Sequence, residues 1–273
     1  MEQPLEKAVI LARGLGTRMR RPDAGAALDV TQAAVADSGV KAMIPIGRPF
    51  LDYVLSALAD AGCPRVCLVI GPEHDAVREY YTRTVALSRL SVTFATQERP
   101  LGTADAVAAA AAFAGRDRFL VINSDNYYPE AALAALRRLG RPGLAVFERD
   151  SLVRDGNVDA ERVRQFAIVR TNPMGELEDI VEKPDAATIE ALGREVYVSM
   201  NCWAFGPAIF KACASIGLSP RGELELTDAV RYSMASMNER YVALPFRAPV
   251  LDLSSRADVS AVAVRLAGIE VRL

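Results

Sequence analysis

The chain has 273 residues, with 34 acidic and 32 basic side chains and a formal net charge of −2. Because the opposite charges are interspersed and nearly balanced, the chain has no electrostatic footprint for nucleic acid or for an anionic membrane surface. The longest apolar runs are too short and too rich in alanine to span a bilayer, and the N-terminus lacks the architecture of a signal peptide. The sequence therefore predicts a cytoplasmic protein without nucleic-acid or membrane partners, long enough for one α/β domain.

Cysteine and histidine usage argues against several kinds of catalytic site. The four cysteines show no CxxC spacing, which favours buried, reduced thiols over a disulfide or a metal centre. The single histidine, His74, stands at the predicted start of a helix, where we expect it to be exposed to solvent. With one histidine, neither a Ser-His-Asp triad nor a zinc hydrolase site is well supported.

The first predicted strand, residues 7–12, leads into a glycine-rich loop. Its apolar run, with two β-branched residues, is typical of a strand buried on both faces. Glycines in the loop allow backbone N–H groups to converge on an anion, and Arg13 and Arg18 flank them with guanidinium groups suited to phosphate oxygens. The stretch predicts a phosphate cradle for a nucleotide, with a plain strand-to-helix turn as the alternative.

Two other phosphate-binding motifs fail on spacing in this loop. A dinucleotide-binding fingerprint would need a third glycine or an alanine where Met19 stands. A P-loop would end in Gly-Lys-Ser/Thr, which this loop lacks. A hydride-transferring enzyme is disfavoured because the dinucleotide-binding fingerprint is incomplete.

Strands and helices alternate along the first half of the chain. Further buried strands are predicted at residues 65–70, 91–95 and 119–123, with helices at residues 50–61 and 73–87. This alternation is typical of a Rossmann-like, doubly wound sheet, in which ligands bind at the carboxyl ends of the strands. The loops that follow these strands are therefore expected to share one edge of the sheet.

The second half of the chain loses this alternation from about residue 151. Residues 164–170 and 177–181 are predicted to pair as strands around a turn at residues 172–175. A small β-rich part is therefore expected beside the doubly wound part.

Seven segments of the chain, in order, resemble the sugar-nucleotide pyrophosphorylases (sugar-1-phosphate nucleotidyltransferases). LARGLGTRM at residues 11–19 is similar to the signature L-A-A/G-G-x-G-T-R-M/L of this family. The other segments are KAMIPIG at 41–47, QERPLGTADAV at 97–107, VINSDNYY at 121–128, EKP at 182–184, ELELTDAV at 223–230 and VLDLSSRADV at 250–259. The resemblance implies the nucleotide-diphospho-sugar transferase fold, a doubly wound mixed sheet with a small β-rich sugar-binding subdomain.

The resemblance also implies how this single domain, residues 1–273, is divided. About residues 1–150 would bind the nucleotide, about 151–250 would bind the sugar, and 251–273 would close the site with a metal ligand and a C-terminal helix. Residues 20–39 depart from the family, which joins its Thr-Arg to its lysine over a shorter stretch. This insert has helix-forming composition and is expected to form a lid over the triphosphate or a cover for the sheet edge.

The residues implied to bind the nucleotide follow predicted strands. Gln97 and Gly102 would recognise the base, because an amide can pair with a pyrimidine edge and glycine lets the backbone approach the ring. Thr103 would lie near the ribose or the phosphates, and the Gly-Thr-Ala form favours UTP, with dTTP also favoured by the family. Arg18 and Lys41 would be catalytic, neutralising the triphosphate. The remaining implied nucleotide contacts are Leu11, Ala12, Arg13, Gly14, Gly16, Thr17 and Asp125.

Two carboxylates are implied as ligands of the expected cofactor, Mg²⁺. Asp125 follows a predicted strand and Asp252 lies in the closing segment. Mg²⁺ takes one or two carboxylates together with phosphate oxygens. Considered alone, an aspartate after a strand, such as Asp125, is usually a turn residue or a helix N-cap.

The sugar side of the implied site departs from the family at one position. Glu182 is implied to bind sugar hydroxyls, Lys183 to place the sugar phosphate as a further catalytic residue, and Glu223 to reach the sugar. Ser199 stands where the family has a sugar-binding asparagine, so Asn201 is the candidate from a shifted position. The identity of the sugar is left open by this difference.

The features together predict an enzyme that transfers a nucleotidyl group from a nucleoside triphosphate, UTP or dTTP, to a sugar-1-phosphate and releases pyrophosphate. Such a reaction depends on positioning and charge stabilisation and needs no covalent enzyme intermediate. The alternatives are an enzyme of the same fold acting on a non-sugar phosphate and a non-catalytic regulatory protein that binds nucleotide sugars. A homo-oligomer is left open.

Overall fold

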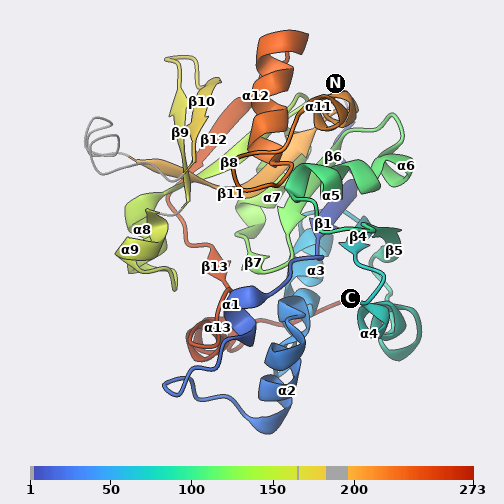
Figure 1. The fold of residues 1–273 in the computed structure, drawn as a ribbon, viewed down its shortest axis with the longest axis vertical. Coiled ribbons are helices and arrows are strands. Elements are labelled where there is room, and N and C mark those ends of the chain that lie inside the picture. Colours follow the sequence, from blue (N-terminus) through green and yellow to red (C-terminus); the bar gives the residue numbers. More distant parts are fainter. Residues whose placement is uncertain (1–2, 165, 183–195) are drawn as a thin grey trace.

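A computed structural model describes residues 3–164, 166–182 and 196–273 of the chain. The described residues form a nine-stranded central sheet in the order β10-β9-β11-β6-β1-β4-β5, from which β8 and β12 branch at β11 (Figure 1). Two hydrophobic cores, each covered by helices, lie against this sheet. The arrangement confirms the predicted mixed, doubly wound α/β fold.

One half of the sheet is parallel. Its strands are β1 (Lys7–Leu11), β4 (Arg65–Ile70), β5 (Ser91–Thr96) and β6 (Phe119–Asn123). Leu11 of β1 pairs with Val69 of β4 and with Asn123 of β6, so the carboxyl ends of these strands lie level. The inner strands are almost wholly apolar because both of their faces are covered.

The other half of the sheet is mostly antiparallel. Its strands are β8 (Gly143–Glu148), β9 (Ala167–Thr171), β10 (Leu177–Val181), β11 (Tyr197–Phe205) and β12 (Val242–Phe246). β11 runs antiparallel to β6 and so joins the two halves. An irregularity between Ser199 and Cys202 interrupts the pairing of β11 with β8, and Asn201 there has a φ of 54°.

The two cores lie on opposite faces of the sheet, because side chains alternate along each strand. On β1, Ala8 and Ile10 belong to one core, whereas Val9 and Leu11 belong to the other. The first core is covered by α3 (Phe50–Asp60), α7 (Glu130–Arg138) and α13 (Asp258–Leu266). The second is covered by α5 (Thr103–Ala109), α11 (Ala208–Ser215) and α12 (Leu226–Met237).

Short elements connect the main layers. They are β2 (Pro45–Ile46), β3 (Arg48–Pro49), α4 (Asp75–Glu79), the π-helix η2 (Tyr80–Thr84), α6 (Ala111–Ala114), α8 (Arg149–Arg154) and α9 (Ala160–Val163). β7 (Asn126–Tyr127) pairs antiparallel with β13 (Leu251–Asp252). This pairing brings the closing segment of the chain to the carboxyl end of β6.

The insert at residues 20–39 follows from the end of α1 (Thr17–Arg20), contains α2 (Val30–Ser38) and leads into the 3₁₀-helix η1 (Lys41–Met43). α2 begins with a capping box, and Gln32 in its first turn donates from Nε2 to the carbonyl oxygen of Pro45 at 2.9 Å. Arg256 of the closing segment donates to the carbonyl oxygen of Met19 at 2.9 Å and pairs with Asp37 on α2. The insert therefore supports the segment that carries Lys41, a role that neither expectation named.

Some predictions about single residues and boundaries are corrected. His74 is buried, 8% exposed, because its Nδ1 accepts a hydrogen bond from the backbone N–H of Gly71 at 3.2 Å. Burial also lowers the pKa of His74, so the neutral imidazole is favoured. The strand predicted at 164–170 begins at Ala167, and the preceding helix α9 ends at Val163.

The cysteine prediction is confirmed, since all four cysteines are free and buried. Burial raises the pKa of Cys63 to about 12 and that of Cys67 to about 11, so these thiols stay protonated near neutral pH. Within the described residues, no helix has the length and apolar character needed to cross a membrane.

Candidate active site

A cavity of about 270 Å³ opens at the carboxyl ends of the parallel strands, the edge at which doubly wound sheets bind ligands. The segments that follow β1, β5 and β6 line it, together with the start of η1. Asn201 of β11 and Glu223, which precedes α12, also line it. The structure therefore brings most of the predicted site residues to one place.

One part of the glycine loop lines the cavity, and another part packs against the neighbouring backbone. Leu11, Ala12, Arg13 and Gly14 line the cavity. Gly16 is packed instead, with a φ of +61° and so little space that a Cβ would lie 2.1 Å from the carbonyl oxygen of Gly39.

The two predicted residues that follow Gly16 do not line the cavity of the described structure. Thr17 and Arg18 form the first turn of α1 and are exposed to solvent. The loop conformation, rather than the guanidinium of Arg18, is thus what this part of the chain presents to the cavity.

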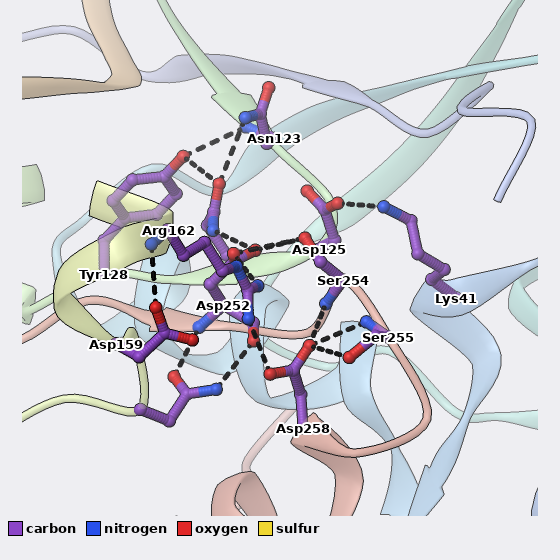
Figure 2. Close-up of polar contacts among 12 residues, drawn as sticks. Lys41, Asn123, Asp125, Tyr128, Asp159, Arg162, Asp252, Ser254, Ser255 and Asp258 are labelled. Carbon is purple, nitrogen blue, oxygen red and sulfur yellow. Dashed lines mark hydrogen bonds and ion pairs between the residues drawn. The ribbon is translucent and has the colours of Figure 1, made fainter. Parts of the chain in front are cut away.

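Lys41 and Asp125 form an ion pair at the wall of the cavity (Figure 2). Their side chains are 15% and 19% exposed, respectively. The backbone of Asp125 is fixed by its own carbonyl oxygen, which accepts from the N–H of Leu253 at 2.8 Å. A flexible ammonium and a fixed carboxylate are therefore both available to a ligand in the cavity.

Gln97 is 4% exposed and its amide is held in one orientation. Its Nε2 donates to the carbonyl oxygen of Gly102 at 3.0 Å and to Oδ2 of Asp105 at 2.7 Å. A carboxylate only accepts hydrogen bonds, so Asp105 fixes which end of the amide carries the hydrogens. Oε1 accepts no hydrogen bond from the described part of the chain and remains as an acceptor in this wall of the cavity.

Gly102 and Thr103 join this wall to α12. Gly102 has a φ of +122°, and a Cβ there would lie 2.5 Å from the carbonyl oxygen of Leu224. Thr103 accepts from the N–H of Leu226, in the first turn of α12, at 2.9 Å. Both residues line the cavity, and both also contact the segment at the start of α12.

Arg13 lies deeper than its predicted role suggests. It is 9% exposed, and its Nη2 lies 3.3 Å from Oε2 of Glu73. Its Nε and Nη1 are buried without a hydrogen-bond partner among the described residues. A Cβ on Gly71 would lie 2.5 Å from Nε of Arg13, so this side chain reaches across the end of β4.

The predicted sugar-binding residues are only partly brought together. Asn201 and Glu223 reach the cavity, and Oδ1 of Asn201 accepts from Nε1 of Trp203 at 3.4 Å. Glu182 is exposed just beyond β10. Lys183 lies outside the described residues.

Asp252 is buried beside Asp125 in a polar cluster (Figure 2). One of its oxygens pairs with Arg162, whose other terminal nitrogen donates to Asp258 at 2.7 Å. Burial, and after it the charge of Asp125, raises the pKa of Asp252, while Arg162 opposes the rise. Burial lowers the pKa of Arg162, but Asp252 and Asp258 outweigh this effect and raise it overall.

The donor set of Asp125 and Asp252 fits Mg²⁺, because both residues offer hard oxygen ligands and the charge of one acts on the other. Within the ranges that the structure describes, no group of three or more His, Cys, Asp or Glu residues could hold a metal ion. A cation at this pair would therefore also need oxygens from a bound ligand.

Sequence reasoning missed several residues of the site. Asp105 could have been recognised from the sequence, because it is an acidic residue in the first turn of the helix that follows Gln97 and Gly102. Arg162 and Asn157 could not, because their contacts with Asp252 join parts of the chain that are far apart in sequence.

A model of the family described as "Nucleotidyl transferase" matches residues 7–248. The chain therefore belongs to the nucleotidyl transferase family, as the motifs predicted.

Named relatives are similar over most of the chain. Glucose-1-phosphate thymidylyltransferase of Streptomyces griseus is 30% identical over 83% of this chain and 56% of its own length. UTP–glucose-1-phosphate uridylyltransferase AglF of Haloferax volcanii is 26% identical over 82% of each chain. The chain spans about half the length of several curated relatives that it matches. A UDP-glucose pyrophosphorylase solved with UDP-glucose shares the fold, with a TM-score of 0.72, 20% identity, and coverage of 96% of this chain and 99% of that one.

Proposed function

We propose that this protein transfers a nucleotidyl group from UTP or dTTP to a sugar-1-phosphate, forming a nucleoside-diphosphate sugar and pyrophosphate. The observation that carries the proposal is one cavity that contains both the oriented amide of Gln97 and the Lys41–Asp125 ion pair. The first group suits the edge of a base and the second suits a triphosphate. The names of the two relatives, a thymidylyltransferase and a uridylyltransferase, support the same reaction.

The orientation of Gln97 supports a uracil or thymine base. Its Oε1 is an acceptor, because Asp105 holds Nε2 as a donor. Uracil and thymine present an N3–H donor at the centre of their pairing edge, whereas cytosine and adenine present a ring-nitrogen acceptor there and donate from an exocyclic amino group at the side. Guanine also offers a ring N–H, so the choice of a pyrimidine rests on the named relatives as well.

The reaction proposed for this cavity is an in-line displacement. An oxygen of the sugar-1-phosphate attacks the α-phosphorus, the bond to the β-phosphate oxygen breaks, and pyrophosphate leaves. Lys41 neutralises the charge that develops on the phosphates, and Lys183 is proposed as a further cation. Arg18 lies exposed outside the cavity and would join them only by turning its side chain towards the phosphates. Mg²⁺ held by Asp125 and Asp252 would supply further neutralisation of the phosphate oxygens.

The sugar is proposed to bind on the antiparallel side of the cavity. Asn201 of β11 and Glu223, which precedes α12, line that side of the cavity, and Glu182 and Lys183 are proposed to join them from the end of β10. The parallel half would then hold the nucleotide and the antiparallel half the sugar, so that the two substrates meet at Asp125.

The proposal is tested by measuring pyrophosphate release with Mg²⁺ across five nucleoside triphosphates and the common sugar-1-phosphates. Release with UTP or dTTP and one sugar-1-phosphate is expected. If a triphosphate binds but no pyrophosphate is released, the acceptor would be a phosphorylated compound other than a sugar-1-phosphate, or the protein would be a nucleotide sensor rather than an enzyme. If no pyrophosphate is released and no triphosphate binds, the proposal is overturned.

A further inference from the structure

The acceptor positions of Asp252 are taken by other side chains (Figure 2). Its Oδ1 accepts from Nδ2 of Asn126 at 3.1 Å, and Oγ of Ser254 lies 2.9 Å from Oδ1 and 3.1 Å from Oδ2. Oδ2 also pairs with Nη2 of Arg162, whose Nη1 donates to Asp258. The positive charge that faces this carboxylate is thus supplied by Arg162.

We infer that Arg162 is a built-in counter-ion of Asp252, and that it must leave this carboxylate before Asp125 and Asp252 can serve one divalent cation. The inference rests on the metal site of the proposed function and deepens it. Metal binding becomes coupled to the position of α9, the four-residue helix that carries Arg162.

Charge makes the two arrangements exclude each other. The side chains of Arg162 and Asp252 are 13% and 5% exposed, and charges so far removed from water are poorly screened. A guanidinium that stayed on Asp252 would repel a divalent cation on the same carboxylate. The site can therefore hold one positive partner at Asp252 at a time.

Arg162 is held less completely than the carboxylate that it neutralises. Its Nε is buried and makes no hydrogen bond within the described part of the chain, which is a cost of this position. The backbone of Asp252 is fixed independently by Asn157, which donates to its carbonyl oxygen and accepts from its N–H, both at 2.8 Å. Movement of Arg162 would therefore leave Asp252 in place.

The inference is tested by titrating Mn²⁺ alone into the folded protein and measuring free Mn²⁺ by electron paramagnetic resonance. Arg162→Gln removes the charge but keeps a hydrogen-bond donor. It should tighten Mn²⁺ binding by about tenfold, the lower end of the coupling measured between close charge pairs. Arg162→Lys keeps the charge and should bind Mn²⁺ as the wild type does.

Arg154→Gln is the matched control for this experiment. Arg154 lies on α8, is 66% exposed and pairs with Asp155, so the same charge is removed nearby without a change at Asp252. Its Mn²⁺ affinity should equal that of the wild type. Equal or weaker binding by folded Arg162→Gln would overturn the inference, because a purely structural role of Arg162 predicts no gain in affinity.

A second measurement uses the wild-type chain and does not depend on any variant folding. Because coupling between two equilibria is reciprocal, saturation with Mn²⁺ should speed amide hydrogen exchange in residues 159–163. Unchanged or slower exchange there would overturn the inference, as would failure of Mn²⁺ to bind at all. The transfer reaction is judged separately by pyrophosphate release, so failure of the metal inference and failure of the proposed function can be told apart.

Discussion

The two carboxylates proposed to bind metal are close to each other but lie in opposite surroundings. Asp125 borders the cavity, with a side chain 19% exposed and Lys41 as its partner. Asp252 is 5% exposed and is enclosed by Asn126, Ser254 and Arg162. The first is open to a ligand, whereas the second is part of the packed interior. A motif names the residue type at such a position, but its neighbours decide what that residue can do.

The largest expected effect of this contrast is on stability. Asp252→Ala would leave Arg162 buried with one carboxylate instead of two, and should lower the free energy of unfolding by about 3 kcal/mol. Asp125→Ala is the matched control and should cost less, because Asp125 borders the cavity and Lys41 is the single charged side chain that loses its partner there. Urea unfolding followed by circular dichroism measures both. Equal losses would show that the two surroundings do not differ in energy.

Turnover should depend on the open pair. Lys41→Ala and Asp125→Ala should each lower the rate of pyrophosphate release by about 10²-fold or more, because each removes a charge that faces the phosphates. Lys211→Ala, an exposed lysine on α11, removes the same charge away from the cavity and should leave the rate unchanged. A near-normal rate in either cavity variant would remove that residue from the mechanism.

The glycine loop contains the same contrast between an open and a packed position. Gly16→Ala should lower the free energy of unfolding by about 1–3 kcal/mol, because a Cβ there meets the backbone of Gly39 and the φ is positive. Gly14→Ala is the control, since nothing lies within 4 Å of its Cβ position. Urea unfolding should separate the two variants, and a stable Gly16→Ala protein would mean that the loop can shift.

The smallest expected effect concerns base selectivity. Asp105→Asn provides a side chain that can donate as well as accept, so the side-chain amide of Gln97 can flip and exchange the positions of Oε1 and Nε2. The ratio of kcat/KM for UTP over CTP should fall by about tenfold, which is the worth of one hydrogen bond. Asp75→Asn changes the corresponding first-turn residue of α4 and should leave the ratio unchanged. An unchanged ratio in Asp105→Asn would mean that Gln97 does not need its partner.

The parallel half of the fold could be predicted from local sequence. The strands at 65–70 and 119–123 and the helix at 50–61 agree with β4, β6 and α3 to within one residue. Each of these segments has an uninterrupted apolar run or a helical spacing that ends at a turn signal. The cavity follows from the same reasoning, because the level ends of parallel strands place their loops at one edge.

The surroundings of each site residue could not be predicted in the same way. Arg162 meets Asp252 only because β13 pairs with β7 and places the closing segment near α9. No local pattern encodes such a contact between distant segments. The prediction that His74 is exposed was wrong for a local reason, since the backbone N–H of Gly71 donates to the imidazole ring and holds it in a buried position.

The cavity takes its walls from both halves of the chain, because Asn201 and Glu223 line it together with the glycine loop and Gln97. A nucleotide that needs all of these walls would bind the folded chain and not the unfolded one. At a concentration a hundred times its Kd, such a ligand would stabilise the fold by about 2.7 kcal/mol. The melting temperature therefore reports how much of the protein has nucleotide bound in the cavity. It can rank nucleoside triphosphates by affinity before any acceptor for the transferred group has been identified.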